Sequence, residues 1–149
     1  MITIDYQDIC RQILPFDLRI RFVGIASIEA RVLAAEYRQD VKPLLTPQES
    51  ELAFMQALMR MAIRRTLEKK LGKTIYSVTL YQKVKRATIA MYDNSSPVDK
   101  KCDSILMVSF DKEADHETII TKKILPFLEQ MGKTLDEEYP VYNLQNPSP

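Results

Sequence analysis

The stretch that most constrains the fold runs from residue 46 to residue 71, and both of its ends carry helix-boundary signals. Thr46 can serve as the N-cap, Pro47 suits the first helical position, and Glu49 completes a capping box with Thr46. Gly72 is the expected C-cap, because it directly follows Leu71 and two lysines that favour the last turn of a helix. The sequence therefore predicts one long helix over 46–71, around which the other elements are arranged.

Apolar side chains in the first half of this helix cover an arc of about 200°, roughly twice the width of a stripe that covers one core face. The part of the arc that we expect to lie on a sheet comprises Leu52, Met55, Met59 and Ile63. The part that then needs a second cover comprises Phe54, Leu58 and Met61. Two covers fit the pattern, namely a neighbouring helix of the same chain or a second copy of this helix in a dimer.

Composition is that of a soluble, globular protein, with 46% hydrophobic and 28% charged residues in a chain of 149. We expect a single domain over residues 1–133 and a flexible C-terminal tail over 134–149, where acidic residues and prolines gather. No apolar run approaches the length of a membrane span. Cys10 and Cys102 lie in no pairing motif, and the acidic N-terminus does not look like a secretory signal, so a cytoplasmic protein with reduced thiols is expected.

Charge is distributed unevenly although the net charge is only +1. Residues 60–86 contain nine basic residues and one acidic residue, while both flanking parts of the chain are acidic. Three interpretations stay open: solvation of one end of the domain, binding of an acidic protein, or binding of nucleic acid or an anionic lipid surface. The candidate basic patch comprises Arg60, Arg64, Arg65, Lys69, Lys70, Lys83, Lys85 and Arg86.

The predicted element order is helix, two strands, helix, three strands, helix. The helices are expected at 5–14, at 46–71 and from 115 onward, with Pro126 kinking or shortening the last one. The strands are expected at 18–26, 31–38, 74–81, 85–92 and 104–110, with a turn at 27–30 and a loop at 93–103. The first and last strands are apolar on both faces, which is typical of interior strands.

This element order resembles the roadblock family of small α/β modules, over about residues 5–132. The resemblance implies an α+β fold in which five strands form one antiparallel sheet in the order 2-1-5-4-3. Residues 20–24 (Ile-Arg-Phe-Val-Gly) and 106–111 (Leu-Met-Val-Ser-Phe-Asp) also look like a small family of soluble archaeal proteins without assigned chemistry. The roadblock family usually has glycine in the first hairpin turn, whereas this chain has Ser-Ile-Glu-Ala at 27–30.

The strand at 74–81 is expected at an edge of the sheet, yet it carries no charge, proline or glycine to prevent pairing with another strand. Roadblock homodimers associate through the long helix and this strand, so the resemblance implies a homodimer. It also implies a scaffold or regulator, with a small GTPase as a candidate partner. The predicted dimer interface comprises Phe54, Leu58, Met61, Ile75, Tyr76, Val78 and Thr79.

No sequence pattern points to an enzyme, a metal site or a cofactor. The single histidine, His116, is expected in the first turn of the last helix as a solvated side chain. A ligand-sensing domain of the PAS kind is less consistent with the sequence, because one long helix replaces the several short helices that usually enclose its cavity. The methionines of that helix are expected to fill the core. A non-enzymatic interaction module is the favoured interpretation, with nucleic-acid binding as the alternative.

Overall fold

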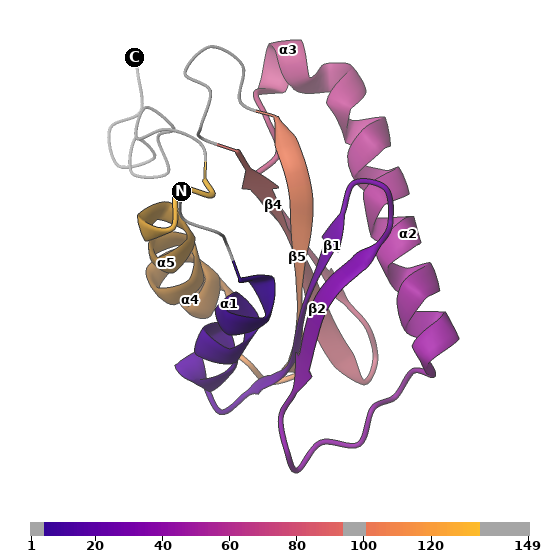
Figure 1. Ribbon diagram of the computed structural model, residues 1–149, viewed down its shortest axis with the longest axis vertical. Helices are drawn as coiled ribbons and strands as arrows, with labels where there is room; N and C mark the ends of the chain where they lie inside the picture. The colour runs from indigo at the N-terminus through magenta and orange to yellow at the C-terminus, as the bar shows by residue number, and fades with distance from the viewer. Residues whose placement is uncertain (1–4, 94–100, 135–149) are drawn as a thin grey trace.

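The computed structural model describes residues 5–93 and 101–134, which form one antiparallel sheet with helices on both faces (Figure 1). Most of the predicted loop at 93–103, and all of the predicted tail except Thr134, lie outside the described residues. The predicted α+β class and element order are confirmed.

The helices are α1 (Tyr6–Ile13), α2 (Pro47–Arg64), α3 (Glu68–Leu71), α4 (His116–Ile119) and α5 (Leu125–Gln130). Short 3₁₀ turns follow α1 (Leu14–Phe16) and join α2 to α3 (Arg65–Leu67), and a π-helical turn (Ile120–Ile124) joins α4 to α5. The strands are β1 (Ile20–Ser27), β2 (Val32–Tyr37), β3 (Tyr76–Leu80), β4 (Val84–Tyr92) and β5 (Cys102–Asp111).

The strand order is β2-β1-β5-β4-β3, as the roadblock resemblance implied. β1 and β5, the strands predicted to be interior, pair with each other and occupy two of the three inner places. Their central segments are buried on both faces, which is why the sequence shows apolar runs instead of alternation there. β2 and β3 are the two edges of the sheet.

Each face of the sheet has its own hydrophobic core. α1, α4 and α5 cover one face, where the buried side chains include Ile9, Ile13, Val23, Val108, Ile120 and Ile124. Among the described residues, α2 is the helix that covers the opposite face (Figure 1). The residues buried beneath α2 are Phe22, Ala26, Phe54, Ala57, Met61, Ala90, Tyr92, Ile105 and Met107.

α2 packs on the sheet with the face opposite to the one predicted from the sequence. Phe54 is 1% exposed and Met61 is 8% exposed, whereas the residues expected to lie on the sheet point to solvent. Gly24 of β1 gives the physical reason, because a Cβ at this position would lie 2.8 Å from Cζ of Phe54 and 2.6 Å from Cζ of Phe22. The missing side chain leaves room for two aromatic rings, so the sheet accepts the phenylalanine face of the helix.

The predicted ends of the long helix are confirmed in detail. Thr46 Oγ1 accepts a hydrogen bond from the Glu49 backbone N–H, and Glu49 Oε1 accepts one from the Thr46 N–H, which completes the capping box. Gly72 follows α3 with a positive φ of 86°, a conformation that glycine adopts without a steric penalty. Between these ends the helix is interrupted only by the 3₁₀ turn at Arg65–Leu67.

The turn between β1 and β2 contains a left-handed residue, a conformation that glycine adopts most readily. Ala30 occupies this position with a φ of 67°, and its N–H donates to the Ser27 carbonyl at 3.0 Å. A left-handed non-glycine residue costs about 1–2 kcal/mol. The hairpin closes nevertheless, because Ser27 N–H also donates to Arg31 O across the turn.

Pro126 changes the last helix in the way that its missing N–H dictates. The chain passes through a π-helical turn just before the proline, with the Leu125 N–H donating to the Ile120 carbonyl. This wider turn accommodates the proline ring and lets the helix continue as α5. The predicted kink is therefore realised as a change of helical pitch.

Candidate functional site

An apolar stripe covers the side of α2 that faces away from the sheet. Its four residues are spaced along the helix, and their side chains are about half or more exposed. They are Leu52 (52% exposed), Met55 (49%), Met59 (59%) and Ile63 (69%). Large apolar side chains gathered in one exposed stripe are typical of a surface that contacts another molecule. We call these four residues the outer stripe.

The strand β3 is an edge of the sheet, as predicted, and one side of its backbone is unpaired within the described part of the chain. Ile75 O accepts from the Ala90 N–H and the Tyr81 N–H donates to Val84 O, so these two residues turn their backbone toward β4. Alternation along an antiparallel strand then turns the backbone of Val78 toward the free edge. β3 can therefore accept another strand through the N–H and C=O groups of alternate residues.

The predicted interface residues on β3 divide between the two faces of the sheet. Tyr76 and Val78 pack against the core beneath α1, α4 and α5. Ser77 lies on the α2 face, since its Oγ is 3.4 Å from Arg64 Nη1. Alternation places Ile75 and Thr79 on that same face.

The helical residues of the predicted interface lie on the face of α2 that packs on its own sheet. Phe54 and Met61 are buried against their own sheet, and the half-buried Leu58 packs beside them. Leu58 also lines a small hollow together with Ile28 of the β1–β2 turn and Thr74, which precedes β3. These three side chains pack in the core of their own chain. The outer stripe, which the sequence analysis expected to lie on the sheet, is exposed instead.

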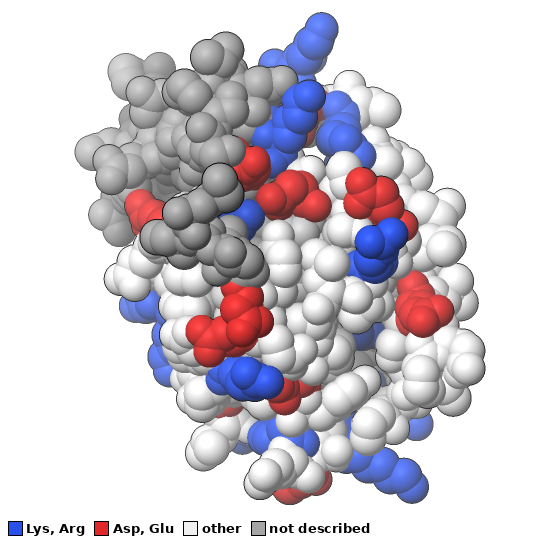
Figure 2. Space-filling model, viewed as in Figure 1, with Lys and Arg blue, Asp and Glu red and all other residues white. Residues whose placement is uncertain are grey.

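The predicted basic patch is not one patch, because β3 carries the chain from one end of the sheet to the other. Figure 2 shows Lys and Arg side chains at the α3 end of the molecule and at the opposite end. The exposed residues at the α3 end, here called the α3 cluster, are Arg64, Arg65, Lys69 and Lys70. Lys83 lies in the turn between β3 and β4, where it lines a cavity together with Glu49 from the start of α2.

The remaining basic residues are in three different surroundings. Lys85 lies on the opposite face of the sheet, where its Nζ donates to Ala114 O at 2.7 Å and is 3.2 Å from His116 Nδ1. His116 is accordingly half-buried and not fully solvated as predicted. Arg60 is half-buried on α2, and Arg86 lies beneath α2 in a cavity.

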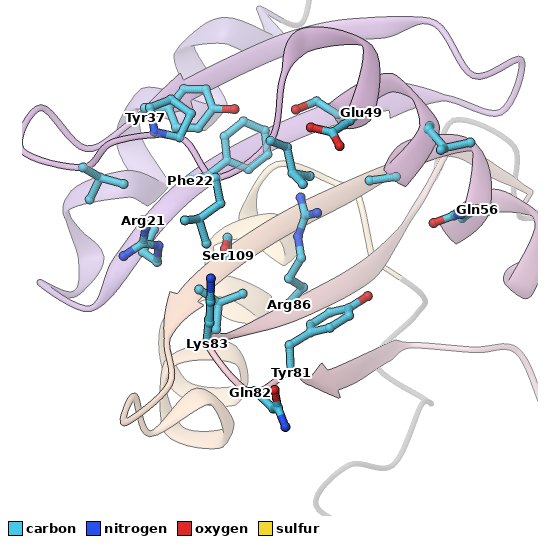
Figure 3. A pocket seen from close by; sticks show the side chains of 18 residues that line it. Arg21, Phe22, Tyr37, Glu49, Gln56, Tyr81, Gln82, Lys83, Arg86 and Ser109 are labelled. Carbon is cyan, nitrogen blue, oxygen red and sulfur yellow. The ribbon is translucent and has the colours of Figure 1, made fainter.

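A cavity of about 570 Å³ opens between the first turns of α2 and the adjacent end of the sheet (Figure 3). All five strands or the turns that end them contribute to it, through Arg21, Phe22, Tyr37, Tyr81, Arg86 and Ser109. The wall on the helix side includes Glu49, Ala53 and Gln56, and the connection before α2 supplies Val41, Pro43, Leu44 and Leu45. This volume lies within the range of cavities that hold small molecules.

Arg86 is the charged group at the centre of this cavity, and Figure 3 shows its side chain extending from β4 toward α2. Its Nε is buried without a hydrogen-bond partner, and Nη2 reaches only the weakly accepting Met107 Sδ at 3.6 Å. Burial lowers the pKa of Arg86, and the phenol groups of Tyr81 and Tyr37 partly oppose that shift. Arginine nevertheless stays protonated in proteins, so the half-buried Arg86 brings a positive charge to the cavity.

Sequence reasoning placed Arg86 among the surface cations and missed the cavity. The available signal was the alternation of β4, which puts Arg86 on the same face as Ala90, beneath the long helix. Arg21, another cation of the cavity wall, is paired with Asp111 at 3.1 Å. Arg86 forms no ion pair with any residue that the structure describes.

The described residues contain no cluster of three or more potential metal-ligating side chains, and none of their helices is long and apolar enough to cross a membrane. Cys10 and Cys102 are free thiols. Burial raises the pKa of Cys10 to about 12, with a further contribution from the carboxylate of Glu36. Since the thiolate is the reactive form, Cys10 is a structural residue.

The fold matches solved structures over most of the chain. Gliding protein MglB from Thermus thermophilus superimposes with a TM-score of 0.60 at 12% identity, covering 89% of this chain and 87% of that one. A structure of MglB with a tetrameric arrangement gives a TM-score of 0.63 at 14% identity, covering 89% and 93%. A Roadblock/LC7 domain from Streptomyces avermitilis gives 0.56 at 13% identity, covering 85% and 99%. The chain has the Roadblock/LC7 fold.

Similarity to this fold is confined to the three-dimensional structure. No model of a known protein family matches the sequence, and no curated protein matches it. At 12–14% identity, the MglB and Roadblock/LC7 structures establish how the chain folds and leave its partners to be inferred from its own surfaces. The free edge of β3 and the outer stripe of α2 are the candidate contact surfaces of this Roadblock/LC7 fold.

Proposed function

We propose that the protein is a non-enzymatic interaction module that forms a homodimer and serves as a scaffold or regulator of a small GTPase. The observation that carries the proposal is the combination of an unpaired edge strand, β3, with an exposed apolar stripe on the neighbouring helix. The Roadblock/LC7 fold supports the proposal, since the similar MglB structure is described in a tetrameric arrangement. The GTPase partner rests on the roadblock resemblance.

Pairing of β3 with its two-fold copy explains the free edge. β3 contains no charged residue, proline or glycine between Tyr76 and Leu80, so it lacks the features that prevent edge pairing. An antiparallel pair about a two-fold axis perpendicular to the sheet would join the two sheets into one. The axis would also keep both copies of α2 on the same face of the joined sheet.

The outer stripe would remain open in such a dimer. Met59 and Ile63 are 59% and 69% exposed on α2, whereas a strand added to β3 extends the sheet sideways. Two stripes on the same face would form one apolar platform for a partner. We therefore assign β3 to the dimer contact and the outer stripe to the GTPase.

Affinity capture with a glutamate at the centre of the outer stripe tests this assignment. Immobilised wild-type protein should retain a small GTPase from the lysate of its host in a manner that depends on whether GTP analogue or GDP is present. Met59→Glu should lower the retained GTPase at least tenfold, because burying one methionine contributes roughly 1.5–3 kcal/mol and a buried glutamate adds a desolvation cost.

The matched control is Leu18→Glu, which places the same charge on a side chain that is 89% exposed and far from α2 in the sequence. This control should capture the GTPase as well as the wild type does. Absence of any GTPase among the captured proteins, or equal capture by Met59→Glu and the wild type, would contradict the assignment.

The α3 cluster supports a second candidate function, binding of nucleic acid or an anionic surface. Its cations lie at one end of the molecule with exposed side chains, and cations at such a site bind phosphates in a salt-dependent way. Reversing the charge of Arg65 and Lys69 to glutamate should weaken oligonucleotide binding at least tenfold in a gel-shift titration at low salt. Substituting Lys83 and Lys112 in the same way is the control, and equal binding by both double variants would dismiss this function.

A further inference from the structure

We propose that the cavity beneath the start of α2 binds a small monocarboxylate with an apolar body, and that Arg86 receives the carboxylate. The cavity lies between the start of α2 and the sheet, and it shares only Leu52 with the outer stripe. The inference does not depend on the proposed function, because it uses neither the dimer nor the GTPase.

The first argument is the uncompensated charge of Arg86. A half-buried guanidinium such as that of Arg86 loses part of its solvation by water, and acceptors that replace the lost water stabilise it. Nε has no partner, and the contact of Nη2 with Met107 Sδ offers little compensation. The Nε and Nη groups of arginine form a fork that matches the two oxygens of a carboxylate, which would supply the missing acceptors.

The second argument is that the nearby carboxylates are already engaged. Glu49 lines the cavity, but its Oε1 accepts the Thr46 N–H at 2.9 Å as part of the helix cap. Asp111 pairs with Arg21 at 3.1 Å and with Arg38 at 3.6 Å. Neither forms an ion pair with Arg86 in the described structure, so the anion that compensates this arginine would come from outside the fold.

The third argument concerns the class of ligand. Phe22, Tyr37 and Tyr81 provide aromatic surface, and leucine, valine and proline of the connection before α2 complete the wall. Such a wall suits a ligand whose remaining atoms, apart from the carboxylate, are apolar. Arg86 is the cation that extends beneath α2, while the exposed Lys83 of the β3–β4 turn also lines the cavity. A monocarboxylate matches the fork of this one guanidinium.

The test compares three probes by calorimetric titration of the full chain: 4-phenylbutyrate, its neutral amide 4-phenylbutanamide, and acetate. We expect saturable binding of 4-phenylbutyrate with a Kd below about 5 mM, as befits a ligand of this size. The amide has the same phenylpropyl group without the negative charge, and acetate has the charge without the phenylpropyl group. Both should therefore bind at least tenfold more weakly. Equal affinity for 4-phenylbutyrate and the amide, or no saturable binding of 4-phenylbutyrate, would overturn the proposal.

Arg86→Met removes the charge and keeps an unbranched side chain, so it should raise the Kd of 4-phenylbutyrate at least tenfold and abolish the preference over the amide. Arg31→Met, at an exposed position in the β1–β2 turn, should change neither. If Arg86→Met does not fold, the site can still be tested by NMR, through changes in the backbone amide chemical shifts of the wild-type protein. On addition of 4-phenylbutyrate, shifts at Phe22, Tyr81 and Ser109 would support the site, whereas shifts confined to other residues would refute it.

Discussion

Phe54→Ala is expected to lower the free energy of unfolding by about 3–5 kcal/mol, the typical cost of truncating a fully buried phenylalanine. The ring is 1% exposed and lies edge-on to Phe22, with ring centroids 6.4 Å apart. It also fills the space that Gly24 leaves open, so neighbouring atoms cannot close the resulting cavity without moving β1. Urea denaturation at one fixed protein concentration measures the change.

Leu18→Ala is the control for this measurement, because Leu18 is 89% exposed and its truncation should change stability by less than about 0.5 kcal/mol. The comparison decides which face of α2 packs on the sheet. A loss below about 1 kcal/mol for Phe54→Ala would mean that the phenylalanine face is not buried as described, since that value lies far outside the range for core phenylalanines.

Val78→Pro is expected to weaken the proposed homodimer at least about fivefold while the chain remains folded. The backbone of Val78 faces the free edge, so proline there removes an N–H that strand pairing needs without breaking the bonds between β3 and β4. Two-fold symmetry doubles the effect, and a net hydrogen bond contributes about 0.5–1.5 kcal/mol per copy. Sedimentation velocity over a dilution series gives the dissociation constant.

Val78→Ala is the matched control, because it truncates the same side chain but keeps the N–H. This variant should dimerise nearly as well as the wild type. Thr79→Pro would be a poor substitute, since alternation turns the Thr79 backbone toward β4 and its loss would destabilise the sheet itself. Equal dissociation constants for Val78→Pro and Val78→Ala would show that β3 is not the contact.

The parts of the fold that were predicted from the sequence are those with a local physical signal. Thr46 and Glu49 specify the start of the long helix by hydrogen bonds within four residues, and Gly72 specifies its end. The interior places of β1 and β5 follow from burial on both faces, which removes the usual alternation of polar and apolar residues. The strand order then followed from the roadblock resemblance.

The orientation of α2 had no comparable signal. Both of its stripes are apolar, so hydrophobic periodicity does not say which one packs on the sheet. The choice depends on the fit between Phe54, Phe22 and Gly24, which join a helix to a strand distant in the sequence. A contact of this kind becomes visible only when the strand and the helix are placed together.

The basic residues illustrate the same limit. Lys70 and Lys83 are close in sequence, but the strand β3 lies between them, and a strand extends by about 3.3 Å per residue. The predicted patch therefore separates into the α3 cluster and cations at the other end of the sheet. Arg86 was grouped with them because the alternation of β4, which places it on the same face as Ala90, does not by itself say that α2 covers that face.

The central claim, that this Roadblock/LC7 fold acts as a homodimer, is tested most directly by the mass of the wild-type protein in solution. Sedimentation equilibrium at loading concentrations from a few micromolar to tens of micromolar gives that mass without reference to molecular shape. We predict twice the mass of one chain at the upper concentrations, with dissociation on dilution. A mass equal to one chain throughout the series would contradict the claim.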